Sequence, residues 1–208
     1  MEKPKLLVFD FDGTIADTKN LYVDAIHRFT CSLGYDFSLL QVEKNLGPKL
    51  GISLGNLGVK EEDVPELREK IHKYIVSKET KIKICSDAKQ GLETLHQKYK
   101  TVLLTNSIRL FVEKILKKYK LKRSFDKLMY SENFITKEDA FRKLAKDYKI
   151  KMKEILYVAD KTNDVQIARK VGCRIAIVLA CSWDKTKFKH ERFVFRNLRE
   201  LLKILGNL

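Results

Sequence analysis

Apolar and polar positions alternate in two ways along most of this chain. Short runs rich in valine, isoleucine and leucine predict strands that are buried on both faces. Between them, apolar residues recur every three or four positions, which is typical of helices packed against a sheet. The expected strands are residues 5–10, 101–105, 127–130, 154–160, 174–179 and, as a short sixth, 193–195. The expected helices are residues 88–99, 108–119, 136–148, 164–171 and 197–205. This alternation predicts the α/β class, with a doubly wound parallel sheet.

The stretch between the first two expected strands follows a different pattern. It lacks convincing strands and shows helical periodicity at residues 21–33, 38–46 and 64–75. A compact α/β fold needs only a short crossover at this point. We therefore expect a small α-helical cap domain, residues 18–82, inserted into an α/β core of residues 1–17 and 83–208, with hinges near Asp17 and Ile84. Four glycines of the stretch do not match the dinucleotide-binding spacing and are expected in turns: Gly47, Gly51, Gly55 and Gly58.

The formal net charge of +15 narrows the expected partners. It favours anions such as phosphate esters or, less specifically, nucleic acid. The lysines are spread over the helical segments and do not cluster with aromatic residues, so they are expected on solvated helix faces. We therefore expect no specific nucleic-acid partner. No apolar run approaches the roughly 18 residues of a membrane-spanning helix, and the first residues do not resemble a leader, which favours a cytoplasmic protein without a membrane partner.

Cysteine and histidine bear on the kind of metal that could bind. The cysteines are far apart in sequence and are expected as core or surface thiols: Cys31, Cys85, Cys173 and Cys181. The histidines are equally dispersed, so no zinc motif is present. Any metal should therefore be a hard cation bound by oxygen.

The most informative segment is Asp10-Phe11-Asp12-Gly13-Thr14, directly after the first apolar run. Two carboxylates with one residue between them would project from the carboxyl end of the sheet, where open α/β folds bind ligands. Such a pair can divide the work, one attacking and holding a metal while the other exchanges a proton with the leaving group. An Asx turn that ends the strand is the alternative interpretation.

Two polar segments follow later strands. Thr105-Asn106-Ser107 precedes a helix expected to start near Ile108, so a hydroxyl and main-chain N–H groups would face an anion there. Ordinary helix capping by Asn106 or Ser107 is compatible with this role. Further along, Asp160 and Asp164 could join Asp10 around one hard cation, although Asp164 could instead cap its helix.

Lys137 is expected in the first turn of its helix, behind a possible capping box from Thr136 to Asp139. A cation there opposes the helix dipole, which indicates a use such as neutralising phosphate. An exposed, solvated lysine is the alternative.

The order of these motifs resembles the haloacid dehalogenase (HAD) superfamily over nearly the whole chain, and specifically its phosphatases with a helical type-1 cap. The cap spacing is similar to that of phosphoglycolate phosphatases and β-phosphoglucomutases. The resemblance implies that Asp10 is the nucleophile and a magnesium (Mg2+) ligand. It implies that Asp12 is the general acid/base and binds magnesium through its main-chain carbonyl. Thr105 and the Asn106 main chain would bind phosphate, Lys137 would neutralise phosphate and nucleophile, and Asp160 would bind magnesium, supported by Asp164 directly or through water.

The expected function is magnesium-dependent hydrolysis of a small phosphorylated metabolite through an aspartyl phosphate on Asp10, by a monomer or homodimer. Family dehalogenases usually lack the second acid, so Asp12 favours phosphoryl transfer over carbon–halogen cleavage. A phosphomutase of the same superfamily is the nearest alternative. A phosphoacceptor signalling module and a nucleic-acid-binding protein on a decayed enzyme fold are more distant ones.

Three positions depart from the family pattern: Ala159 before the fourth-motif acid, Lys161 after it, and Glu138 after the lysine. Lys161 either adds positive charge at the site or points to solvent. Two further residues are possible substrate contacts. They are Lys49 and Trp183, for which surface exposure and core packing, respectively, are the favoured interpretations.

Overall fold

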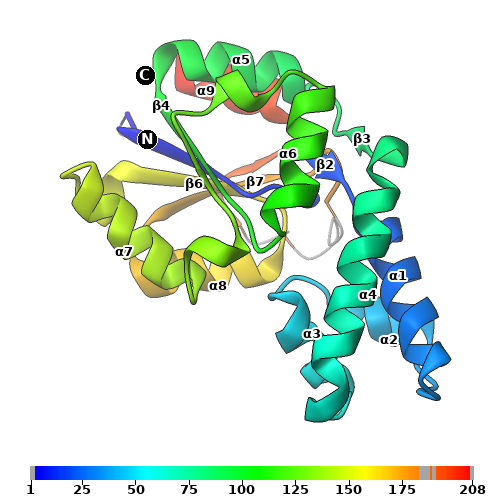
Figure 1. Cartoon of the computed structure of the whole chain (residues 1–208). Helices are drawn as coiled ribbons and strands as arrows, with labels where there is room; N and C mark the ends of the chain where they lie inside the picture. Colours follow the sequence, from blue (N-terminus) through cyan, green and yellow to red (C-terminus); the bar gives the residue numbers. More distant parts are fainter. Residues whose placement is uncertain (1–2, 183–187, 189–190, 207–208) are drawn as a thin grey trace.

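An α/β core stands beside a separate group of helices (Figure 1). The computed structural model describes residues 3–182, 188 and 191–206, so Trp183 lies outside the described residues. The main sheet has six parallel strands in the order β5-β4-β1-β6-β7-β8. Their bounds are β1 Leu6–Phe9, β4 Lys100–Leu104, β5 Lys127–Met129, β6 Ile155–Ala159, β7 Arg174–Val178 and β8 Val194–Phe195. Each agrees with a predicted strand to within about one residue, so the predicted parallel sheet is confirmed.

Helices cover both faces of the sheet. Their bounds are α5 Ala88–Lys98, α6 Arg109–Lys118, α7 Lys137–Asp147, α8 Thr162–Val171 and α9 Leu198–Gly206. Buried side chains of α5, α6 and α9 pack with Leu7 and Phe9 of β1 in one apolar cluster. Those of α7 and α8 pack with Leu6 and Val8 in another. Because side chains alternate between the faces of a strand, β1 supplies both layers of a doubly wound core.

Strand β1 lies within the sheet, and all of its side chains are fully buried. Phe9 pairs with Leu103 of β4 on one side and with Val158 of β6 on the other. The chain therefore leaves all three strands at the same edge. Asp10 follows β1 there, as Thr105 follows β4 and Asp160 follows β6.

The helical insertion, residues 18–82, separates β1 from the rest of the core. Its helices are α1 Lys19–Ser32, α2 Leu39–Lys44, α3 Leu50–Leu57 and α4 Val64–Ser77, and they lie together to one side of the sheet (Figure 1). Helices α1 and α4 pack on each other, with the ring centroids of Phe29 and Tyr74 5.6 Å apart. Ile26 and Ile71 are fully buried. The insertion thus has an apolar interior built mainly by its two long helices.

A two-stranded ribbon joins the insertion to the core. Strand β2, Ala16–Asp17, pairs antiparallel with β3, Lys83–Ile84. The Cys85 N–H also donates to the carbonyl of Ile15, with the nitrogen and oxygen 2.8 Å apart. The sequence indicated hinges at these positions but no strands, because a run of two residues carries no periodicity. Both crossings between the two regions therefore lie side by side.

The expectation that the glycines of the insertion serve turns is wrong for Gly51 and Gly55, which lie inside α3. Gly47 and Gly58 do have positive φ angles, +129° and +91°. Glycine disfavours a helix by about 1 kcal/mol relative to alanine, which hid α3 in the sequence. Burial of Leu54 against the rest of the insertion offsets that cost.

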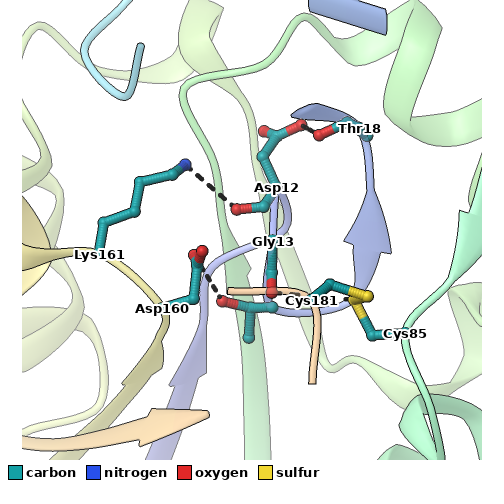
Figure 2. The surroundings of a disulfide bond; sticks show 8 residues. Asp12, Gly13, Thr18, Cys85, Asp160, Lys161 and Cys181 are labelled. Atoms are coloured by element: carbon teal, nitrogen blue, oxygen red, sulfur yellow. Dashed lines mark hydrogen bonds between the residues drawn. A yellow bond between two sulfur atoms is a disulfide. The ribbon is translucent and has the colours of Figure 1, made fainter. Parts of the chain in front are cut away.

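Two cysteines are joined where only thiols were expected. Cys85, directly after β3, forms a disulfide with Cys181, which follows β7; their Cα atoms are 5.5 Å apart. Cys31 is an exposed thiol and Cys173 a buried one, as expected. The disulfide fastens the ribbon to the loop beside Asp160 (Figure 2). Among the described residues, no helix combines the length and the apolar composition needed to cross a bilayer.

Candidate active site

The loop after β1 turns sharply because Gly13 has a φ of +87°. A Cβ atom at this position would lie 2.1 Å from Oδ2 of Asp160, so the approach of that carboxylate also requires glycine. Asp10 and Asp12 are 2 % and 7 % exposed. The thin loop thus lets an acid from β6 come close to the two acids that follow β1.

Three buried carboxylates gather at this edge: Asp10, Asp160 and Asp164 each place an oxygen within 4.8 Å of the others. Asp164 Oδ2 is fully buried and has no hydrogen-bond partner among the described residues. A cluster of carboxylate oxygens with an unpaired member is the donor set that a hard divalent cation prefers. The residues present therefore fit the metal that the sequence predicted.

Lys137 reaches into this cluster from the first residue of α7. Its Nζ lies 2.9 Å from Asp10 Oδ1 and 3.1 Å from Asp164 Oδ1. Burial alone would lower the pKa of Lys137, but the two carboxylates raise that pKa above its usual value, so the lysine is a cation at neutral pH. Thr136 caps the helix by accepting from the Asp139 N–H. The solvated-lysine alternative is therefore wrong.

The pKa values of the Asp10 and Asp164 carboxyl groups are shifted in opposite directions. Burial raises the pKa of Asp10, although Lys137 opposes this effect. For Asp164 burial also favours the neutral form, yet Lys137, Lys161 and its hydrogen bonds lower its pKa below the usual range. Asp164 therefore holds its negative charge more firmly than Asp10 does.

Tyr157 completes the cluster and was not singled out from the sequence. Its hydroxyl donates to Asp164 Oδ1 at 2.6 Å and accepts from Lys137 Nζ at 2.6 Å. Tyr157 lies within the apolar run of β6, where its hydroxyl gave no separate signal. It fixes the relative positions of one cation and one anion.

The Asp12 carboxylate points to other partners. It accepts from the hydroxyls of Thr18 and Ser107, each at 2.7 Å, and from Thr105 at 3.3 Å. Ser107 Oγ also lies 2.8 Å from the hydroxyl of Tyr22 on α1. Thr18 is the first residue before α1, yet its side chain makes no capping bond. The side chain of Asp12 is thus held by groups from both the core and the start of the insertion. Figure 2 shows the contact with Thr18.

The predicted phosphate-binding segment touches the insertion. The side-chain amide of Asn106 donates to the carbonyl of Gly47 at 3.0 Å. Helix α6 begins after Ile108 without a side-chain cap, so neither Asn106 nor Ser107 caps it. The Thr105 side chain accepts from the Ser107 N–H at 3.0 Å. Thr105 and Asn106 therefore lie at the same edge as the acids, where the sequence predicted them.

Lys161 points into the site and not to solvent. It is 9 % exposed, and its Nζ donates to the main-chain carbonyl of Asp12 at 3.1 Å (Figure 2). Burial opposes its charge, but Asp160, Asp10 and Asp12 raise the pKa of Lys161 above its usual value. Thr14, inside the first motif, donates to Asp160 Oδ1 at 3.2 Å. The departure noted at position 161 thus adds a second buried cation.

Lys49 makes a contact between insertion and core. Its Nζ donates to the carbonyl of Ser131 at 2.7 Å and to that of Phe134. The lysine is half-buried, so the expectation of a surface side chain is wrong. Between the two regions lies a cavity of about 40 Å³. Its lining includes Asp12, Asn106 and Lys161 from the core and Tyr22, Gly47 and His72 from the insertion.

Comparison with known proteins agrees with this geometry. The sequence profile described as "Haloacid dehalogenase-like hydrolase" matches residues 7–178. The chain is 27% identical to a phosphoglycolate phosphatase of Vibrio parahaemolyticus, over 97% of this chain and 96% of that protein. It is 28% identical to a relative from Caldanaerobacter subterraneus that carries the provisional name pyrophosphatase PpaX, over 96% and 93% of the two chains.

Solved structures share the fold. A hydrolase from Pseudomonas syringae superposes with a TM-score of 0.86 at 20% identity, covering 98% of this chain and 99% of that one. A sequence profile that covers most of the chain assigns the family directly. The chain therefore belongs to the haloacid dehalogenase-like hydrolase family, and it is an enzyme of the phosphatase kind.

Proposed function

We propose that this protein is a magnesium-dependent phosphatase that hydrolyses a small phosphate monoester through a phosphoryl group carried on Asp10. One observation carries the proposal. The Asp10 carboxylate contacts the buried cation Lys137, and Asp12, on the same loop, is oriented by hydroxyl groups. A nucleophile beside a fixed positive charge and a separate proton carrier are what phosphoryl transfer requires.

Lys137 prepares Asp10 to attack an anionic substrate. Its ammonium group, 2.9 Å from Asp10 Oδ1, screens the repulsion between carboxylate and phosphate. Tyr157 and Asp164 hold the ammonium in place from the other side. Asp10, Asp160, Asp164 and the carbonyl of Asp12 would hold magnesium, which when bound would supply Lewis-acid charge to the phosphate oxygens.

Asp12 carries the proton in both halves of the reaction. It donates a proton to the departing alkoxide as Asp10 takes the phosphoryl group. It then accepts a proton from the water that attacks the aspartyl phosphate, which regenerates both carboxyl groups. Hydrogen bonds from Thr18 and Ser107 keep its carboxylate directed toward the cavity between the two regions.

Residues 18–82 act in this proposal as a cap over a core of residues 1–17 and 83–208. A cavity of about 40 Å³ holds only a few water molecules, whereas metabolites need a larger space. Substrate entry therefore requires the cap to move away from the core about the β2–β3 ribbon. The cap contacts that would separate are those of Gly47 with Asn106 and of Lys49 with Ser131.

The first substrate to test is phosphoglycolate, because a relative across nearly the whole chain carries that activity in its name. Phosphate release from a panel of phosphorylated metabolites is measured with and without magnesium. Asp10→Asn should lower kcat by at least roughly a thousandfold, as expected for loss of a nucleophile. Asp36→Asn, an exposed aspartate of the insertion, is the matched control and should retain full activity.

Asp12→Ala tests the intermediate. This variant should accumulate a phosphoenzyme that mass spectrometry detects on the peptide containing Asp10. Unchanged magnesium-dependent turnover by Asp10→Asn would overturn the nucleophile assignment.

A further inference from the structure

Lys161 is the second buried lysine at the Asp10 carboxylate, and the catalytic proposal gives it no task. It is the residue before α8 and directly follows Asp160. Its Nζ donates to the carbonyl oxygen of Asp12 at 3.1 Å and lies 3.9 Å from Asp10 Oδ2 (Figure 2). Lys137 contacts the other oxygen of the same carboxylate, Oδ1. The two oxygens of Asp10 therefore face two different ammonium groups.

The two oxygens near Lys161 are the kind that a hard divalent cation binds. Carboxylate and main-chain carbonyl oxygens are the usual protein ligands of such ions. Both belong to residues that we have assigned to the magnesium site. The remaining assigned ligands, Asp160 and Asp164, lie within the same cluster of carboxylates. An ammonium group beside these two oxygens would repel a divalent cation bound to them, because both are positively charged.

We propose that Lys161 is a built-in competitor of the divalent cation: its ammonium group hydrogen-bonds to the Asp12 carbonyl and forms an ion pair with Asp10 Oδ2, two oxygens that the metal needs, and it must move aside when the metal binds. The inference rests on the proposed function to the extent that the same oxygens hold magnesium. It adds a property of this chain, a metal affinity that is set by the residue at position 161.

The displaced side chain has a place to go. Lys161 also borders an outer cavity of about 440 Å³ between α2 and the start of α8. Glu43 of α2 lines that cavity and pairs with Lys19. A lysine side chain has a flexible stem of four carbons. Its ammonium can therefore turn from the inner oxygens toward the outer cavity without movement of the main chain. Metal binding would then bring the Lys161 ammonium toward the carboxylate of Glu43 on the insertion.

Direct metal titration tests the proposal without substrate. Magnesium is titrated by calorimetry into the chelator-treated full chain, as wild type and as Lys161→Met, which keeps the length of the side chain and removes its charge. We expect Lys161→Met to bind magnesium roughly tenfold more tightly or better, since juxtaposed like charges are strongly unfavourable. Asp160→Asn should lose the binding heat, which assigns the ion to this site.

Lys170→Met is the matched control. Lys170 lies on α8, is exposed and pairs with Glu138, so its loss changes the net charge equally without touching the carboxylates. Its magnesium affinity should equal that of wild type. Lys161→Arg should bind magnesium as weakly as wild type, because it keeps the charge. If the methionine variant does not fold, Lys161→Arg is compared with Lys161→Ser instead.

Thermal unfolding gives an independent readout. Without metal, Lys161→Met should melt at a lower temperature than wild type, because three buried carboxylates lose one counter-charge. Saturating magnesium should raise its melting temperature by more than that of wild type. Equal or weaker magnesium binding by Lys161→Met, or no binding by either protein, would overturn the proposal. If the wild type hydrolyses no phosphate ester and Lys161→Met still binds magnesium more tightly than wild type, only the proposed function is overturned.

Discussion

The core and the insertion present different chemistry to the cavity between them. On the core side, four acids and two lysines are buried at one edge of the parallel sheet, and Asp12 and Lys161 among them border the cavity. On the insertion side, the lining carries no charged residue and consists of Tyr22, Ser53, His72, Gly47 and the apolar residues Leu46, Pro48 and Leu50. Burial lowers the pKa of His72, so this histidine is neutral at physiological pH. On the proposed function, the reaction therefore depends on the core, and the insertion determines which substrates fit.

The difference has a physical cause. Burying charges is expensive unless each is paired and hydrogen-bonded, and a rigid sheet edge can hold such pairs in register. A unit that must move cannot do this at low cost, because opening would expose and unpair the charges. Beside the cavity, contacts between insertion and core end on main-chain carbonyls, as those of Asn106 with Gly47 and of Lys49 with Ser131 do. Substitutions on the core side should therefore change kcat, and those on the insertion side should change KM.

Removal of Lys137 should have the largest effect. In Lys137→Met, kcat for the phosphate ester should fall by about 10²–10³-fold, the usual loss for one electrostatic group. The variant should also unfold at a lower denaturant concentration, because Asp10 and Asp164 lose their shared cation. Lys143→Met, on the exposed face of α7, is the control. A change in KM alone would contradict the assignment of charge chemistry to the core.

The junction between the two regions should come next. Without the Cys85–Cys181 disulfide, the free energy of unfolding should fall by about 2–4 kcal/mol, since the bond closes a long loop. Urea unfolding of the Cys85→Ser, Cys181→Ser double variant against wild type measures this. Cys31→Ser removes an exposed free thiol and should be neutral. Alkylation of the denatured protein before and after reduction counts the paired cysteines, and four reactive thiols in the denatured, unreduced protein would show that the bond does not form.

Tyr157→Phe should have a smaller effect, confined to the core. The hydroxyl bridges Lys137 and Asp164 without bordering the cavity, so kcat should fall by roughly tenfold while KM stays the same. Tyr148→Phe, at the end of α7, is the control. An unchanged pH profile of kcat in Tyr157→Phe would argue that the tyrosine only fills space.

The smallest effect is expected on the insertion side. Lys49→Met removes hydrogen bonds to the carbonyls of Ser131 and Phe134, so the closed arrangement loses stability and KM should rise about fivefold at constant kcat. Steady-state kinetics with the same ester distinguish this outcome from a change in kcat. Lys44→Met, exposed on α2, is the control. A fall in kcat with KM unchanged would contradict the division between the two regions.

The sequence predicted the parallel sheet and the meeting of its polar residues because both follow from local patterns. Apolar runs mark the strands, and residues that follow parallel strands must share an edge. The features that the sequence did not predict depend on contacts between residues far apart in the chain or on weak helix propensity. The pairing of Cys85 with Cys181 spans 96 residues, and α3 contains two glycines. For Lys161, only the packed chain decides whether a flexible side chain turns inward.

The side-by-side crossings of β2 and β3 restrict how the insertion can travel. Two strands paired to each other cannot pivot independently, and the disulfide pins their end to the core. The insertion should therefore rotate as one body about a single hinge axis along the ribbon. Points near that axis, such as Thr18, should shift less than the parts of the insertion that lie farther from the ribbon. Asp12 can thus keep its hydrogen bond from Thr18 even when the insertion has moved away from the core.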